Sequence, residues 1–116
     1  MVITRRADVL EACAALPATT DERPFGPETA VAKVVGKVFA LTPLDSEVES
    51  VTLKVAPAHG EALVRDHSYI RPGYHMNKRH WVTVTLGPDS DGELVFDLIV
   101  NSYDLVVANL PRAQRP

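Results

Sequence analysis

The stretch TAVAKVVGKVFALTPL, residues 29–44, decides the fold class of this 116-residue chain. Apolar and β-branched residues dominate residues 29–35 and 38–44. Gly36-Lys37 between the two runs fits the glycine-first two-residue loop of a β-hairpin. Because an isolated hairpin is only marginally stable in water, the stretch predicts a larger antiparallel sheet.

Two further segments alternate apolar and polar residues, as strands with one buried face do. Residues 51–55 and residues 81–86 each show this alternation. The apolar positions are Val51, Leu53, Val55, Val82, Val84 and Leu86. These segments are predicted as a third and a fourth strand.

Three segments carry helical periodicity or the signals of helix ends. We expect the first helix to follow Thr4 as its N-cap and to end at Pro17. Residues 57–67 form a second, shorter helix with proline in its first turn. Residues 93–110 form the longest helix, after a turn that supplies an acidic or serine cap. Its apolar stripe includes Val95, Leu98, Ile99, Leu105 and Val106.

The segments between these elements read as loops, and the whole reads as one domain. Residues 21–27 contain two prolines and a glycine, and we expect Phe25 to anchor this extended loop in the core. Residues 45–49 form an acidic loop. The resulting αβββαβα order predicts an α+β fold over residues 1–116. It has a single antiparallel β-sheet of at least four strands, with the two terminal helices packed together on one face.

Composition places the chain among ordinary globular proteins, with 46% hydrophobic and 23% charged residues. The single cysteine, Cys13, excludes an internal disulfide framework and a cysteine-rich metal site. No apolar run approaches the length of a membrane span, and the first residues do not resemble a signal peptide. We therefore expect a soluble, cytoplasmic protein with no membrane partner.

Charge is distributed unevenly along the chain, whose formal net charge is −3. Residues 65–80 hold four basic residues and one acidic residue, a local +3, which leaves −3 − 3 = −6 for the rest. The pattern indicates that one basic surface, rather than the whole molecule, meets an anion.

The basic stretch continues to Trp81 and offers several groups that suit nucleic acid. Arg71, Lys78 and Arg79 supply cations for phosphates, and Asn77 can present a donor and an acceptor to a base edge. Tyr74 offers a ring for stacking. The candidate DNA-contacting residues are Arg71, Tyr74, His75, Asn77, Lys78, Arg79 and His80.

Structural alternatives stay open for the same residues. Arg71 and His75 could satisfy buried carbonyl groups, and Lys78 with Arg79 could form a solvated face. Asn77 could be a turn residue at positive φ, and a large aromatic residue that opens a strand, such as Trp81, usually packs in a core.

Metal and enzyme interpretations find little support. His67, His75 and His80 lack the spacing of a zinc site, and no cofactor is predicted. Cys13 falls on the apolar stripe of the first helix, where a thiol is usually inert. No catalytic constellation and no glycine-rich phosphate loop is visible.

Four blocks in the same order closely resemble the MmcQ/YjbR family of small bacterial proteins. The blocks are residues 24–27, 36–41, 71–81 and 101–107. The chain departs from the family pattern at Val82, where asparagine is common, and at Val55, where cysteine is common. The resemblance implies a fold similar to CyaY, the bacterial frataxin, and a DNA-binding role with a double-wing arrangement.

We therefore expect a small DNA-binding protein that contacts phosphates through residues 71–81, weakly and in a salt-dependent manner. The alternative is an adaptor that uses the same loop to bind a protein or a small anion, without catalysis.

Overall fold

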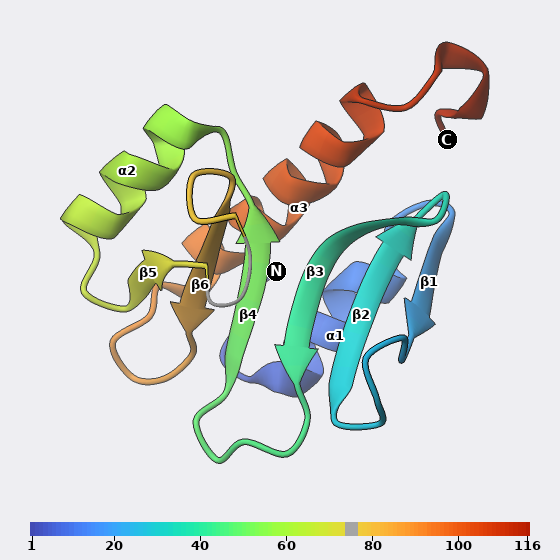
Figure 1. The fold of residues 1–116 in the computed structure, drawn as a ribbon. Helices are drawn as coiled ribbons and strands as arrows, with labels where there is room; N and C mark the ends of the chain where they lie inside the picture. The colour runs from blue at the N-terminus through green and yellow to red at the C-terminus, as the bar shows by residue number, and fades with distance from the viewer. Residues whose placement is uncertain (74–76) are drawn as a thin grey trace.

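The structure, a computed structural model, describes residues 1–73 and 77–116, and one six-stranded sheet dominates it (Figure 1). In chain order its elements are α1 (Arg6–Ala14), β1 (Thr19–Glu22), β2 (Thr29–Val34), β3 (Lys37–Pro43), β4 (Ser50–Lys54), α2 (Pro57–Asp66), β5 (Ile70–Pro72), β6 (Trp81–Thr85), α3 (Gly92–Ala108) and a 3₁₀ turn (Arg112–Gln114). The strands lie in the order β1-β2-β3-β4-β6-β5, and every neighbouring pair is antiparallel. The α+β class and the single antiparallel sheet are confirmed.

The predicted order αβββαβα is wrong in its strand count, because both edge strands were missed. The polar strand β1 pairs with β2 over four residues, in a region where the sequence predicted loop. The strand β5 is three residues long and ends in proline. Neither strand shows the apolar alternation of a strand with one buried face, because β1 has four polar residues and β5 is too short to show a period.

The hairpin between β2 and β3 is confirmed, but its loop lies one residue earlier than predicted. Val34 pairs with Lys37, so the loop is Val35-Gly36 rather than Gly36-Lys37. Val35 has φ +49° and Gly36 has φ +76°. Positive φ at both central residues defines a type I′ turn, whose twist matches that of the flanking strands.

A strained residue in this turn allows a stabilising substitution. Val35 is β-branched and 40% exposed, and such residues rarely adopt positive φ. Replacement of Val35 by asparagine, which tolerates this conformation, is expected to raise the free energy of unfolding by about 1 kcal/mol. Urea denaturation measures the change. Val48→Asn is the matched control, because Val48 is also exposed but has no positive φ. An equal gain in both variants would contradict the strain argument.

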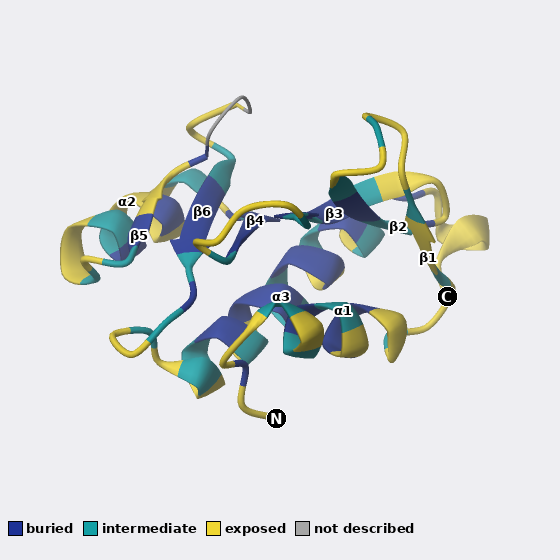
Figure 2. Cartoon of the chain, turned by 90° about the horizontal axis from the view of Figure 1, so that it is seen from below, coloured by how far each residue is buried: buried dark blue, intermediate teal, exposed yellow. Residues whose placement is uncertain are grey.

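The helices α1 and α3 lie side by side on one side of the sheet, as predicted (Figure 2). The helix α3 crosses β3 and β4, while α2 packs against β5 and β6. The predicted cap of α3 is confirmed, since the Asp91 carboxylate accepts the N–H groups of Glu93 and Leu94. One predicted core residue is misplaced: Leu98 is buried, but Leu105 is only half-buried.

A β-bulge in β3 turns one aromatic ring into the core. The register shifts from Ala32↔Ala40 to Lys33↔Val38, which leaves Phe39 as the extra residue. Phe39 is fully buried, and its ring meets that of Tyr103 edge-to-face at a centroid distance of 5.4 Å. The bulge therefore joins the sheet to α3.

Phe25 does not anchor the β1–β2 connection in the core, contrary to the prediction from sequence. Its side chain is 67% exposed. Backbone bonds hold the loop instead: the Gly26 N–H donates to the Arg23 carbonyl, and the Leu44 N–H donates to the Glu28 carbonyl. Because these bonds already fix the loop, its conformation does not require the ring to be buried.

Candidate nucleic-acid interface

The connection between β5 and β6 is anchored to the sheet at both of its ends. The Gly73 N–H donates to the Trp81 carbonyl at 2.8 Å, and the Val55 N–H donates to the His80 carbonyl at 2.8 Å. A Cβ atom on Gly73 would lie 2.7 Å from the Cβ of Trp81, so only glycine permits this approach. The sheet thus fixes where the basic residues of the connection emerge.

The structure places the predicted contact residues unequally. Asn77, Lys78 and Arg79 are exposed, and His80 is half-buried. Tyr74 and His75 lie outside the described residues. Within residues 1–73 and 77–116, the side chains of Lys78 and Arg79 have no hydrogen bond or ion pair. Both charges are therefore available to an external anion.

Asn77 organises the turn that presents these two cations. Its Oδ1 accepts the Arg79 N–H at 3.0 Å, and its carbonyl accepts the His80 N–H at 3.1 Å. Asn77 is therefore a turn residue, as the structural alternative expected. The Oδ1 atom already serves the backbone, which leaves the amide Nδ2 as the group that Asn77 can offer to a ligand.

Arg71 stands opposite Thr83 on the neighbouring strand β6. Its guanidinium donates to Thr85 Oγ1 at 2.6 Å and remains exposed. A neutral hydroxyl orients the side chain without cancelling its charge. Trp81 is half-buried rather than fully in the core, and it stands opposite Lys54 on the neighbouring strand. The sheet face that bears Trp81 therefore carries two more cations, Arg71 and Lys54.

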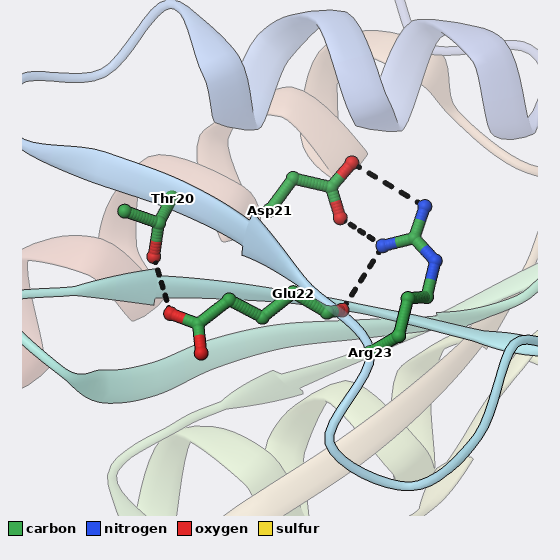
Figure 3. Close-up of polar contacts among 4 residues, drawn as sticks. All are labelled: Thr20, Asp21, Glu22 and Arg23. Carbon is green, nitrogen blue, oxygen red and sulfur yellow. Dashed lines mark hydrogen bonds and ion pairs between the residues drawn. The ribbon is translucent and has the colours of Figure 1, made fainter.

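The strand at the other edge of the sheet, β1, carries two carboxylates that polar contacts engage (Figure 3). Asp21 forms an ion pair with Arg23, and Glu22 pairs with Lys33 at 3.2 Å. The Thr20 hydroxyl donates to the Glu22 carboxylate, and together with Lys33 it lowers the pKa of that group. Asp21 and Glu22 thus each have a cationic partner, whereas Lys78 and Arg79 have no such partner among the described residues.

Other chemical sites find no geometric support among the described residues. In those two ranges, no group of three metal-ligating side chains comes together. Cys13 is buried beside a cavity of about 110 Å³ between α1 and the sheet. Burial, with a smaller contribution from Asp21, raises the pKa of its thiol to about 12. Over the same described residues, no helix has the length and hydropathy needed to cross a bilayer.

Fold and site together define the class: an α+β protein with one antiparallel sheet and an exposed basic connection before its last inner strand. The sequence model of the YjbR family matches residues 14–105. The chain therefore belongs to the YjbR family.

Relatives and solved structures agree with this assignment. The chain is 40% identical to the uncharacterized protein YbdF of Escherichia coli O157:H7 over 89 residues, which is 77% of this chain and 73% of YbdF. It is 30% identical to the uncharacterized protein YjbR of Escherichia coli K12, over 94% and 92% of the two chains.

Two crystal structures share the fold. The Deinococcus radiodurans protein DR2400 matches with a TM-score of 0.89 and 39% identity, over 97% of this chain and 86% of that one. A Pseudomonas syringae protein matches with a TM-score of 0.74 and 30% identity, over 86% and 97%.

Proposed function

We propose that this protein is a small cytoplasmic DNA-binding protein of the MmcQ/YjbR type, with a CyaY-like fold, that contacts phosphates through residues 71–81. One observation carries the proposal: Lys78 and Arg79 are exposed and unpaired within the described residues, on a connection that the sheet anchors at both ends. Arg71 adds a third cation for a phosphate on the neighbouring strand β5, with its guanidinium held at Thr85.

A double-wing arrangement is part of the proposal. The β1–β2 connection, residues 23–28, and the described residues of the β5–β6 connection rise from the same side of the sheet, opposite α1 and α3 (Figure 2). Their charges differ, because carboxylates flank the first connection and cations fill the second. In this proposal the β5–β6 connection supplies the phosphate contacts, and the β1–β2 connection fits against the duplex by its shape.

The salt dependence of duplex binding tests the proposal. Three phosphate contacts give a slope of about −2.7 for log affinity against log salt, a fall of roughly forty-fold between about 50 and 200 mM salt. Lys78→Ala with Arg79→Ala is expected to weaken binding to all duplexes and to flatten the slope by about two. Stability should change by less than about 0.5 kcal/mol, because both residues are exposed.

A matched control removes the same charge elsewhere. Lys37 and Arg112 are exposed and lie outside the basic connection. Their replacement by alanine should leave the slope unchanged. If the Lys78 and Arg79 variant binds duplex with the parent's affinity and slope, residues 71–81 are not the DNA surface.

The adaptor alternative is favoured by the small number of cations. A small anion needs only the Lys78 and Arg79 pair, which exists without a long basic surface. Retained binding of inorganic phosphate with no binding of duplex would select this alternative.

A further inference from the structure

A pocket with an apolar floor lies directly beside the basic connection. It has a volume of about 310 Å³ and is lined by residues of α2, the end of β5, the residues just before β6 and Val82 in β6. Figure 1 shows α2 beside β5 and β6. That volume is at the lower end of the range for small-molecule sites, about 300–1,000 Å³. Its apolar lining comes from Pro57, Val64, Pro72 and Val82.

A close contact between α2 and the sheet forms the floor. A Cβ atom on Gly60 would lie 2.8 Å from Val55 Cγ2 and 3.7 Å from Val82 Cγ1. Glycine at this position lets the helix approach the strands, and Val64, one turn later, lines the pocket on the same helix face. The two prolines contribute no N–H groups, so the lining offers few polar contacts.

The rim is cationic. Arg65, Lys78 and Arg79 line the pocket against a single carboxylate, Glu61, a net charge of 3 − 1 = +2. Arg65 is partly engaged by its neighbour Asp66 at 3.0 Å. Lys78 and Arg79 have no side-chain partner in the part of the chain that the structure describes. An anion is therefore attracted to the side of the pocket formed by Lys78 and Arg79, just before β6.

These two properties together define the ligand. An apolar floor gives a free phosphate no advantage, and a cationic rim gives a neutral apolar molecule none. A nucleotide satisfies both, because its base presents a flat aromatic face and its phosphate is anionic. Resting on the proposed DNA-binding function, we propose that this pocket receives an unpaired nucleobase while Lys78 and Arg79 hold the adjacent phosphate.

The consequence is a preference for DNA with accessible bases. A base inside a duplex must be unstacked and unpaired before it can enter a pocket, and this costs least in a mismatch or a single strand. Contacts to one exposed base typically change affinity by about fivefold or more. Single-stranded and mismatched DNA should therefore bind about fivefold tighter than the perfect duplex.

Fluorescence anisotropy with three labelled probes of equal length tests this preference: a thymine-rich single strand, a perfect duplex and the same duplex with one central T·T mismatch. Val64→Phe fills the pocket and keeps every cation of its rim. It should abolish the preference and leave duplex affinity and salt slope unchanged. Val48→Phe, at an exposed residue in the β3–β4 loop, is the matched control and should keep the preference.

A second measurement does not depend on any variant. Thymidine 5′-monophosphate added to the parent protein should shift the methyl resonances of Val64 and Val82. Shifts confined to Lys78 and Arg79 would show phosphate binding alone and overturn the pocket. Equal methyl shifts with octanoate would overturn it too, because the pocket would then accept any apolar anion.

The outcomes separate this inference from the function on which it rests. Equal affinity for the three probes, or a preference that survives Val64→Phe, overturns the pocket and leaves DNA binding intact. Failure to bind any of the three probes overturns both.

Discussion

Replacement of Leu98 by alanine is expected to lower the free energy of unfolding by about 2–5 kcal/mol. Leu98 is 2% exposed and belongs to the central core cluster, on the helix that crosses β3 and β4. Truncation removes buried methyl groups and leaves a cavity that the surrounding strands cannot fill. Urea denaturation measures the loss.

Leu105 supplies the control on the same helix. It is half-buried, so water reaches the truncated site and the cost should be about 1 kcal/mol. Both variants make the same leucine-to-alanine change within α3, so the change in helix propensity is the same. A difference between their losses of stability therefore reports the cavity. Equal losses at the two positions would mean that burial does not set the cost.

The fold could be predicted from sequence wherever a segment is buried on one face. The inner strands β2, β3, β4 and β6 and the helix α3 all carry the periodicity of their buried side. The edge strands do not, because β1 reads Thr-Thr-Asp-Glu and β5 has only three residues. Their pairing is decided by the neighbour's free backbone groups, which leave no mark on the sequence of the edge strand.

The candidate site was only partly predictable for a similar reason. The local excess of cations is a property of sequence, and the exposure of Lys78 and Arg79 agrees with it. The pocket cannot be predicted from sequence in the same way, because it depends on how closely α2 approaches β4 and β6. Gly60 is the sequence feature that hints at the close approach of α2, but a glycine within a helix is first interpreted as lowering helix stability.

Replacement of Ser102 by alanine is expected to lower the free energy of unfolding by about 2–4 kcal/mol, although it removes a single oxygen atom. Ser102 is fully buried in α3. Its hydroxyl donates to the Phe39 carbonyl at 2.6 Å and accepts the Lys54 N–H at 2.8 Å. It therefore bridges β3 and β4 where these strands no longer pair directly.

The cost arises because the Phe39 carbonyl and the Lys54 N–H both lose the hydroxyl to which they are hydrogen-bonded. The register between β3 and β4 covers two pairs, Ala40↔Leu53 and Leu41↔Thr52. Just beyond them, alanine would leave a buried carbonyl and a partly buried N–H without partners, at about 1–3 kcal/mol each. Water cannot easily replace the hydroxyl at a site with no exposure.

Ser90 provides a matched control for this prediction. Its hydroxyl also links a backbone N–H and a backbone carbonyl, both of Gly87, but the residue is half-buried in a turn. Water can take over these bonds, so Ser90→Ala should cost about 1 kcal/mol or less. Similar losses in the two variants would refute the bridging role of Ser102.

Amide hydrogen exchange shows which backbone N–H groups lose protection in Ser102→Ala. The Lys54 amide should exchange faster in this variant than in Ser90→Ala, because it loses its acceptor. Lys54 pairs with Trp81, and the next residue, Val55, donates to the His80 carbonyl that anchors the basic connection. Faster exchange that extends to Val55 would therefore connect a buried hydroxyl on α3 to the position of the basic connection, residues 71–81.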